Sequence, residues 1–497
     1  MSSTDYRFDD RQWLILLASG LLALLALRIV ALGLNQTDLF FDEAQYWFWS
    51  LEPAFGYYSK PPLIAWIIGL STSICGVSEF CVRLPSPLLH TATAIGVFFV
   101  GRQLYDTRTG VIAALVFATL PGVSLSSGII STDVPLLMFW AIALYAFVRL
   151  IETQETRSWW PALLFGLAFG AGLNAKYAMA WFVMCTIIYL VMTPERRWLA
   201  RDVRLYAALG LGVLMLVPNI LWNLENKFAT LSHTADNAKW GGPLVHPNKA
   251  LEFFGAQFGV FGPILFTALL IICWRAVRQK LPEADRLLIA FSVPVVVAIL
   301  VQAFLSRAHA NWAAVAYVAA TVLVTATMIR DVAWPWLKSS FAIHLAVIGL
   351  LIVGVATAGM LPMPFGAAPF ARTLGWQEVA ASVRQEIASA AARGEPYAAI
   401  VSDDRPVTAE LLYYMRHEKT PVYAWRAKER PRDHYELVRP FTGAVKGPIL
   451  LVTLFGDNST VPEHFQSAKK IAEKTLPAGD NATRRVVFYR LSGYKDG

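Results

Sequence analysis

The sequence predicts a polytopic, all-helical membrane domain followed by a small α/β domain, and three observations lead to this prediction. Of the 497 residues, 56% are hydrophobic and only 16% are charged, whereas soluble globular proteins contain about 25% charged residues. Apolar runs of spanning length alternate with short polar loops in the first part of the chain. Later the runs stop, and short helix-like and strand-like segments alternate. We therefore expect a membrane domain over residues 1–362 and a second domain over residues 363–497.

The apolar runs predict about 11 to 13 transmembrane helices, because roughly 20 apolar residues cross the hydrocarbon core. Those that can be delimited lie at residues 13–34, 84–101, 110–128, 134–150, 159–174, 177–194, 205–222, 253–274, 287–305, 312–329 and 340–360. The first run has no small-residue cleavage site, so we expect a retained helix rather than a signal peptide. The run at residues 62–76 has only about fifteen residues, which is short for a span. We expect it to lie in the membrane interface.

Basic residues predict the orientation in the membrane. If residues 62–76 do not cross, most loop arginines and lysines fall on one side, as the positive-inside rule requires. We therefore expect a cytoplasmic N-terminus, with the first loop (residues 35–83) and the C-terminal domain on the opposite side. An anionic ligand would explain the cations that remain on that outer side, which are Lys60, Arg83, Lys176, Lys227, Lys239, Lys249 and Arg307.

Composition and motifs also exclude several functions. The net charge of +8 reflects basic loops and does not indicate nucleic-acid binding. The four cysteines lie in or beside apolar segments, so the C-terminal domain has neither a disulfide nor zinc-ligand spacing. There is no GxxxxGK(S/T) or GxGxxG nucleotide-binding loop and no HExxH motif. Any sugar donor is therefore expected to be lipid-linked.

The C-terminal domain is predicted to alternate helices with strands. We expect helices at residues 376–392 and 407–416, and strands at residues 397–402, 449–454 and 485–491. Such alternation within about 130 residues is typical of a small α/β domain. We expect this domain to act as a lid or an acceptor-docking module.

Residues 41–62, FDEAQYWFWSLEPAFGYYSKPP, follow the first predicted span and carry the strongest indication of chemistry. In a helix, Asp42, Gln45 and Trp49 share one face, and charges beside a bilayer must face water or a polar cavity. Asp42 and Glu43 are candidates for a general base toward a hydroxyl, or for ligands of a hard cation. Alternatively, they are acidic residues in a first turn, where the helix dipole favours them.

Three further positions carry polar groups at predicted helix ends. Lys60 follows Tyr57 and Tyr58, and an ammonium beside hydroxyls suits a phosphate oxygen. The alternative is an interfacial lysine that snorkels beside a tyrosine belt. Asp133 lies at a predicted outward turn. It caps the following helix, belongs to the same polar cavity, or does both. Lys176 interrupts two apolar runs and is either a helix-end cation or a contact to phosphate or sugar.

Two later segments are also candidates for ligand contacts. Arg307 and Asn311 belong to RAHANW, a polar interruption between two apolar runs. The predicted outer loop at residues 223–252 carries His233 and Trp240, which suit a sugar site. A solvated loop is the simpler explanation for that composition.

Together these motifs resemble the signature of GT-C membrane glycosyltransferases. The resemblance rests on the Asp42–Glu43 pair, on YYSKPPL at residues 57–63, and on SEFCVRLPS, GRQLY and STDVPL, which follow in the same order. The relatives concerned are lipid A aminoarabinose transferases, rhizobial lipopolysaccharide galacturonosyltransferases and protein O-mannosyltransferases (glycosyltransferase families 39 and 83). The resemblance implies a GT-C fold with periplasmic juxtamembrane helices in a bacterial inner membrane.

The resemblance also implies roles for individual residues. Asp42 takes the position of the catalytic aspartate, and Asp133 that of a second family aspartate. Lys60 takes the position of a lysine that contacts the donor phosphate, with Tyr57 or Tyr58 assisting.

The sequence departs from the aminoarabinose transferases at Gln45, where an arginine is expected. This removes one phosphate contact, which Arg83 or Arg307 would supply. Residues expected to contact the sugar or the acceptor are Gln45, Trp49, His233 and Asn311.

We expect an inverting glycosyltransferase that uses a polyprenyl-phosphate sugar to modify lipid A or the lipopolysaccharide core on the periplasmic side. We expect it to act as a monomer among membrane lipids. No cofactor is expected with certainty, and a divalent cation bound by Asp42 is the one candidate. Protein O-glycosylation is the alternative within the same class, and a transporter or flippase for a polyprenyl-linked sugar is the alternative from another class. A transporter needs polar groups near mid-membrane, whereas the charges here gather at predicted helix ends.

Overall fold

The computed structural model describes residues 8–238, 244–360, 368–479 and 481–495. The chain divides into two compact units. The membrane unit comprises Met1–Gly33, Lys60–Ile64 and Arg83–Ile352, and the C-terminal unit comprises Leu34–Ser59, Ala65–Val82 and Val353–Gly497. The predicted boundary at residues 362 and 363 falls outside the described residues, as do Lys239 and Trp240.

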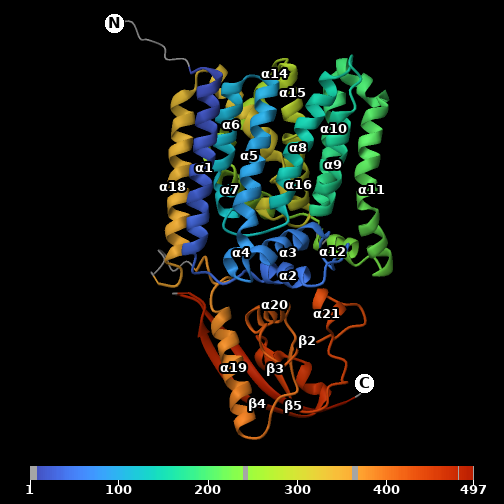
Figure 1. Ribbon diagram of the computed structural model, residues 1–497, viewed down its shortest axis with the longest axis vertical. Helices are drawn as coiled ribbons and strands as arrows, with labels where there is room; N and C mark the ends of the chain where they lie inside the picture. Colours follow the sequence, from blue (N-terminus) through green and yellow to red (C-terminus); the bar gives the residue numbers. More distant parts are fainter. Residues whose placement is uncertain (1–7, 239–243, 361–367, 480, 496–497) are drawn as a thin grey trace. The chain divides into compact units, whose positions relative to one another are not determined.

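Within its described residues the membrane unit contains helices and no strand, as predicted (Figure 1). Its helices are α1 (Asp10–Leu34), α5 (Pro85–Leu104), α6 (Thr107–Thr119), α7 (Pro121–Ser126), α8 (Asp133–Glu152), α9 (Trp160–Ala175), α10 (Trp181–Met192), α11 (Val203–Glu225), α12 (Ala229–Ala238), α13 (Pro247–Val260), α14 (Pro263–Arg278), α15 (Glu283–Ala290), α16 (Val293–Leu305), α17 (Ala316–Arg330) and most of α18 (Trp334–Ala356). Short 3-10 helices are η1 (Tyr177–Ala180), η2 (Pro194–Arg201) and η3 (Ala310–Ala313).

Six helices of the described chain are long and apolar enough to cross a membrane, or seven if a bent pair counts as one span. The six are Asp10–Leu34, Glu79–Leu104, Asp133–Glu152, Val203–Glu225, Glu283–Leu305 and Trp334–Ala356. Shorter apolar helices are Leu63–Cys75, Thr107–Thr119, Trp160–Ala175, Tyr177–Met192 and Ala316–Arg330. Each predicted span therefore coincides with a helix or a helix pair, although several are shorter than a full crossing.

Three predictions about continuity are wrong. The span predicted at residues 110–128 breaks at Leu120, because that residue is extended before Pro121, which begins α7. The span predicted at residues 253–274 consists of α13 and α14, which bend by 116°. The bend lies at Gly262, whose φ of +92° is costly for other residues. The predicted loop after α11 contains a further helix, α12.

Small residues let the helices of the membrane unit approach closely. A Cβ atom on Gly166 of α9 would lie 2.8 Å from the backbone oxygen of Ala208 in α11. Such backbone contact is typical of helix association in membranes, where packing rather than the hydrophobic effect holds helices together. The neighbouring helices α8 and α9 also pack along each other. This packing matters for function because the polar residues described below lie at the ends of α8 and α9.

The C-terminal unit contains a five-stranded mixed sheet with strand order β2-β1-β3-β5-β4. Strand β1 is parallel to β2 and β3, and β5 is antiparallel to β3 and β4. Its elements are α2 (Phe41–Ser50), most of α3 (Leu63–Cys75) and α4 (Glu79–Arg83), α19 (Trp376–Ala392), β1 (Ala399–Ser402), α20 (Arg405–Tyr414), β2 (Val422–Ala424), α21 (His434–Val438), β3 (Ile449–Thr453), η5 (Gly456–Asn458), η6 (Val461–His464), β4 (Phe465–Pro477) and β5 (Thr483–Tyr494).

The small α/β domain predicted from the sequence is confirmed, and its sheet carries a hydrophobic core on each face. Ile400 and Leu450 belong to one core, and Val401 and Leu451 belong to the other, as expected for alternating side chains. The five predicted helices and strands are present. Strands β2 and β4 were not predicted, because β2 has three residues and most side chains of β4 are exposed.

Helix α2 folds with the C-terminal unit, although almost 330 residues separate it from α19. It packs against α20, where the rings of Trp47 and Tyr413 meet edge to face with centroids 4.9 Å apart. The backbone N–H of Leu39, just before α2, donates to the hydroxyl of Tyr414 at 2.9 Å. The candidate catalytic segment and the C-terminal domain therefore share one core.

Asp38 makes a second connection between these segments. Its Oδ2 atom accepts hydrogen bonds from the backbone N–H groups of Trp376, at 2.7 Å, and Gln377, at 3.4 Å. These two residues begin α19, and the residue before them, Gly375, has no side chain to cap the helix. A carboxylate from a distant segment therefore caps the N-terminus of α19, where the helix dipole favours negative charge.

Asp38→Ala is expected to lower the free energy of unfolding of the C-terminal unit by about 1–2 kcal/mol, because it leaves these N–H groups without their acceptor. Thermal unfolding of the purified protein in detergent, followed by tryptophan fluorescence, measures the change. Glu463→Ala is the matched control, because Glu463 is exposed and its side chain has no hydrogen bond to any described residue. Equal melting temperatures for both variants would contradict the capping role.

Candidate active site

The acidic pair at the start of α2 separates into two different environments. Glu43 is fully buried, and its Oε2 atom accepts a hydrogen bond from the backbone N–H of Phe40 at 2.9 Å. It therefore stabilises the first turn of α2, which is the structural alternative considered for the pair. Asp42 instead remains 37% exposed. Of the two carboxylates, Asp42 is the one that a substrate can reach.

Asp42 pairs with an arginine from the C-terminal domain. The Nη1 atom of Arg405, the first residue of α20, lies 2.9 Å from Oδ1 of Asp42 and 3.1 Å from Oε1 of Gln45. The guanidinium also stacks on Phe41, with 4.6 Å between its Cζ atom and the ring centroid. Oδ2 of Asp42 takes no hydrogen bond from any described residue. Asp42 and Gln45 thus share one face of α2, as expected. The arginine that contacts both side chains was not predicted.

This ion pair contributes little to stability. Both side chains are about one third exposed, 32% for Arg405 and 37% for Asp42, and exposed pairs typically contribute about 0–1 kcal/mol. The arrangement instead orients Asp42 and keeps a guanidinium beside it. These properties suit a reactive carboxylate whose partner can be exchanged for a substrate group.

Three of the predicted contact residues have structural partners in the C-terminal unit. The rings of Trp49 and Tyr57 are stacked, with centroids 4.7 Å apart, and both contact the ring of His434. Tyr57 donates to the backbone oxygen of Trp49 at 2.9 Å, and Tyr58 donates to that of Pro431 at 2.7 Å. Burial raises the pKa of Tyr57 to about 12. Contacts of these residues to a sugar or a phosphate stay predictions.

The membrane unit brings three predicted residues together. Oδ1 of Asp133 lies 2.6 Å from Nζ of Lys176, and Oδ2 accepts a hydrogen bond from Nδ2 of Asn311 at 2.7 Å. Asp133 begins α8, Lys176 follows the end of α9, and Asn311 lies in η3. Asp133 is only 10% exposed and Lys176 20% exposed. Residues separated by 43 and 178 positions thus form one polar cluster inside an apolar unit.

The other predicted cations differ in their surroundings. Arg307 lies four residues before Asn311, and its Nε atom is buried without a hydrogen-bond partner among the described residues. Arg83 ends α4 and is buried at 2% exposure, and Lys60 precedes α3. In the membrane unit, His233 belongs to α12, where its Nε2 atom lies 2.9 Å from Nδ2 of Asn237. Phosphate contacts of these cations and a sugar contact of His233 stay predictions.

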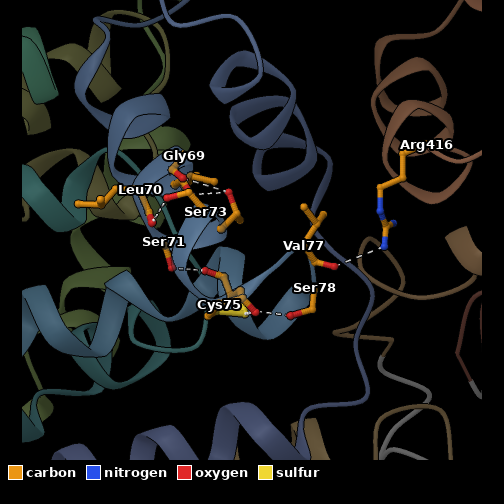
Figure 2. Close-up of a disulfide and its surroundings, with 11 residues drawn as sticks. Gly69, Leu70, Ser71, Ser73, Cys75, Val77, Ser78 and Arg416 are labelled. Carbon is orange, nitrogen blue, oxygen red and sulfur yellow. Dashed lines mark hydrogen bonds between the residues drawn. A yellow bond between two sulfur atoms is a disulfide. The ribbon is translucent and has the colours of Figure 1, made fainter.

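A disulfide that we did not predict joins Cys75 and Cys81 between α3 and α4 (Figure 2). Ser71 donates to the backbone oxygen of Cys81 at 2.6 Å, and Nη2 of Arg416 donates to that of Val77 at 3.4 Å. The available signal was a pair of cysteines six positions apart, just after a segment expected on the outer side. From the sequence we noted only that all four cysteines lie in or beside apolar segments, and we made no prediction about this pair.

No three His, Cys, Asp or Glu side chains of the described chain are grouped so that they could hold a metal ion. Asp42, the predicted cation ligand, has an arginine as its charged partner. A metal ion at Asp42 would have to displace this guanidinium or bind at the other carboxylate oxygen. The role of Asp42 as a metal ligand stays a prediction.

Comparison with known proteins identifies the family. A family profile described as dolichyl-phosphate-mannose-protein mannosyltransferase matches residues 59–222. Lipid A galacturonosyltransferase RgtD of Rhizobium johnstonii is 37% identical over 440 residues, which cover 88% of this chain and 90% of that protein. The structure of ArnT from Cupriavidus metallidurans bound to undecaprenyl phosphate has a TM-score of 0.63 at 16% identity, covering 96% of this chain and 98% of the other.

A shorter match supports the same assignment. An undecaprenyl phosphate-alpha-4-amino-4-deoxy-L-arabinose arabinosyl transferase of Erwinia tasmaniensis is 30% identical over 168 residues, 32% of this chain and 29% of that protein. The chain therefore belongs to the GT-C superfamily of membrane glycosyltransferases, in the family that includes lipid A galacturonosyltransferase RgtD. The predicted fold class and enzyme class are confirmed, and the chain is a multi-pass membrane protein.

Lys176→Met is expected to lower glycosyl transfer roughly 100-fold, because it leaves the partly buried Asp133 carboxylate without its cation. Asn311→Ala, which removes only a neutral hydrogen-bond donor, is expected to have a smaller effect. Transfer by purified variants measures both, with the folded fraction checked by gel filtration. Lys338→Met is the control, because Lys338 is exposed in α18 and its side chain has no hydrogen bond or ion pair with any described residue. Wild-type transfer by Lys176→Met would exclude this cluster from the reaction.

Asp404, directly before Arg405, is expected to make stability depend on pH. Burial, and secondarily the neighbouring Asp403, raise the pKa of Asp404 to about 6, above the usual Asp value of about 3.9. The folded state therefore holds the proton more tightly, so this group stabilises the fold as the pH falls from about 7 to about 4. Above about pH 7, where Asp404 is ionised, its buried charge lowers the free energy of unfolding by up to about 3 kcal/mol.

Asp404→Asn should remove this dependence. We expect the variant to melt at a higher temperature than wild type at pH 8, at a temperature higher by about half that difference at pH 5, and at nearly the same temperature at pH 4. Melting of the detergent-purified protein at several pH values measures the difference, with Glu463→Gln as the exposed control. If Asp404→Asn leaves the dependence of the melting temperature on pH unchanged, other groups cause that dependence.

Proposed function

We propose that this enzyme transfers a sugar from a polyprenyl-phosphate donor to lipid A or the lipopolysaccharide core on the periplasmic side of the inner membrane. The observation that carries the proposal is the Asp42 carboxylate, which is oriented by Arg405 and has one oxygen without a hydrogen bond to any described residue. The relative RgtD is a lipid A galacturonosyltransferase at 37% identity. The solved structure of ArnT with undecaprenyl phosphate supports the class of donor.

In the proposed reaction, an acceptor hydroxyl oxygen attacks the anomeric carbon of the sugar. The bond between that carbon and the phosphate oxygen breaks, and its electron pair leaves with the polyprenyl phosphate. The hydroxyl proton passes to Oδ2 of Asp42. A carboxylate is a weak base toward a hydroxyl, so this proton transfer comes late and orientation contributes much of the rate.

Cations supply the complementary part of the mechanism. Negative charge develops on the departing phosphate, and preorganised cations stabilise such charge strongly in a site with little water. We assign this role to Lys60, Lys176 and Arg307, with Arg83 in support. Asp133 orients Lys176 through their contact at 2.6 Å. Arg307 suits the role because its buried Nε atom has no partner among the described residues.

The disulfide supports the proposed orientation in the membrane. Structural disulfides persist in oxidising compartments such as the bacterial periplasm and are rare in the cytosol. Cys75 and Cys81, which the bridge joins, both belong to the C-terminal unit, although the last residue of α4, Arg83, belongs to the membrane unit. We therefore infer that this unit is periplasmic, which agrees with the distribution of basic loop residues and with a cytoplasmic N-terminus.

A protein acceptor is the second candidate, because the family profile that matches residues 59–222 describes protein mannosyltransferases. The relative with 88% coverage of the chain favours the lipid acceptor. The two acceptors would leave different products, a glycosylated lipid A or core oligosaccharide in one case and a glycosylated envelope protein in the other.

Deletion of the gene is expected to remove one sugar mass from lipid A or the core oligosaccharide. Wild-type protein should restore it, and Asp42→Asn should restore less than about 1% of it, because the amide cannot accept the proton. Mass spectrometry of lipid A, core and envelope glycoproteins measures the result. Asp10→Asn is the control, because Asp10 is exposed at the start of α1.

Unchanged lipid A and core after deletion, together with a glycoprotein that loses a sugar, would replace the proposed acceptor. Full restoration by Asp42→Asn would remove the proposed base while leaving the acceptor in place.

A further inference from the structure

The hairpin of α3 and α4, which the disulfide closes, contacts both helices that carry the candidate catalytic pair. A Cβ atom on Gly69 of α3 would lie 3.4 Å from Cβ of Ser50, the last residue of α2, and 3.6 Å from its backbone oxygen. Just after the end of α20, Arg416 donates from Nη2 to the backbone oxygen of Val77 at 3.4 Å (Figure 2). Arg416 also donates from Nη1 to the backbone oxygen of Tyr413 at 2.9 Å. The hairpin therefore holds α2 and α20 at their C-terminal ends.

Asp42 and Arg405 pair at the opposite ends of the same two helices. Asp42 is the second residue of α2, and Arg405 is the first residue of α20. Between the two ends, Trp47 of α2 packs on Tyr413 of α20. Helix α2 has ten residues and is therefore about 15 Å long, so a tilt of about 4° at its held end moves the other end by about 1 Å. A displacement of about 1 Å from the productive geometry can lower a reaction rate about 100-fold.

The disulfide is the main constraint on the last turn of α3. Leu70 and Ile74 are 65% and 79% exposed, and Cys75 is exposed as well, so this turn buries little apolar surface against the described residues. One side-chain hydrogen bond spans the hairpin, from Ser71 to the backbone oxygen of Cys81 at 2.6 Å. Segments with few buried apolar contacts open locally at a low free energy. Without the covalent bond, the support that the hairpin gives to α2 and α20 would weaken.

We propose that the bridge between Cys75 and Cys81 is a positioning element for the transfer reaction, and that transfer depends on the oxidation of these two cysteines. The bridge acts through α2 and α20, which place Asp42 and Arg405. The proposal rests on the proposed role of Asp42 as the base and adds a covalent modification on which that role depends. It also names a class of partner, the thiol–disulfide oxidoreductases of an oxidising compartment, which form such bridges.

The exposure of the two cysteines indicates how the bridge opens. Cys75 is exposed and Cys81 is 4% exposed, so the thiolate of a dithiol reductant attacks the sulfur of Cys75. The bond between the two sulfurs breaks, and the Cys81 thiolate leaves and takes up a proton. The second thiol of the reductant then attacks the mixed disulfide. This step releases Cys75 as a thiol and leaves the reductant as a disulfide, so that two electrons and two protons have passed to the protein.

Reversible reduction of the purified enzyme tests the proposal. The enzyme is added to membranes of the deletion strain, which hold unused donor and unmodified acceptor, and mass spectrometry follows the initial rate of transfer. Reduction with dithiothreitol should lower this rate about 10- to 100-fold, and oxidised glutathione should restore it. Cys75→Ser combined with Cys81→Ser should keep the low rate under both conditions. Cys185→Ala combined with Cys273→Ala is the matched control, because it removes only the two free cysteines and should respond as wild type does.

Two further readouts separate positioning from a general loss of structure, with every rate normalised to the folded fraction by gel filtration. The residual transfer by Asp42→Asn should not change on reduction, because this variant has no base to position. Arg416→Gln should lower the rate of the oxidised enzyme, but it should add little to the loss in the double serine variant, because both changes act through the same hairpin. Arg393→Gln is the control, because Arg393 is exposed in the same unit and pairs with Glu386.

Three results would overturn the proposal. Maleimide labelling of Cys75 and Cys81 in the unreduced enzyme would show that no bridge forms. Full transfer by the reduced enzyme would show that the bridge does not position the base. An equal fractional loss on reduction in wild type and in Asp42→Asn would assign the bridge to overall stability. Failure of the proposed function looks different, because oxidised wild type would then transfer no sugar, or Asp42→Asn would transfer at the wild-type rate.

Discussion

The packing of α2 against α20 is the constraint on which the candidate catalytic carboxylate depends. The ion pair between Asp42 and Arg405 is too exposed to hold itself together, since pairs of this kind contribute about 0–1 kcal/mol. Burial of the large rings of Trp47 and Tyr413 contributes more, because aromatic side chains bury extensive apolar surface. The weak polar contact is therefore positioned by a strong apolar one. This explains why a segment next to the first membrane helix folds with the C-terminal domain.

Much of the fold and part of the site could be predicted from the sequence. Apolar runs locate the helices because the bilayer requires long apolar segments. Breaks were missed where Pro121 and Gly262 interrupt such runs, and between α15 and α16. The residues Asp133, Lys176 and Asn311 were selected because they are polar groups that interrupt apolar runs and could contact a ligand. The structure supplies those partners in one cluster, at 2.6 and 2.7 Å.

The remaining features could not be predicted, because they depend on pairing between distant segments. Arg405 lies 363 positions from Asp42, and an arginine in a polar domain gives no local indication of its partner. The capping of α19 by Asp38 has the same origin, with 338 positions between donor and acceptor. Strand β4 was missed for another reason, since exposed edge strands lack the alternation of hydrophobic residues that marks a buried strand.

The two candidate carboxylates differ in a way that separates their roles. Both oxygens of Asp133 are engaged, one by Lys176 and one by Asn311, and the side chain is 10% exposed. Taking up a proton there would weaken a partly buried ion pair, which is costly. Asp42 has one engaged oxygen and is 37% exposed, so its second oxygen can accept a proton without loss of the contact to Arg405. A general base must offer a free acceptor within reach of the substrate. On this ground we propose Asp42 as the base and Asp133 as the residue that orients a cation.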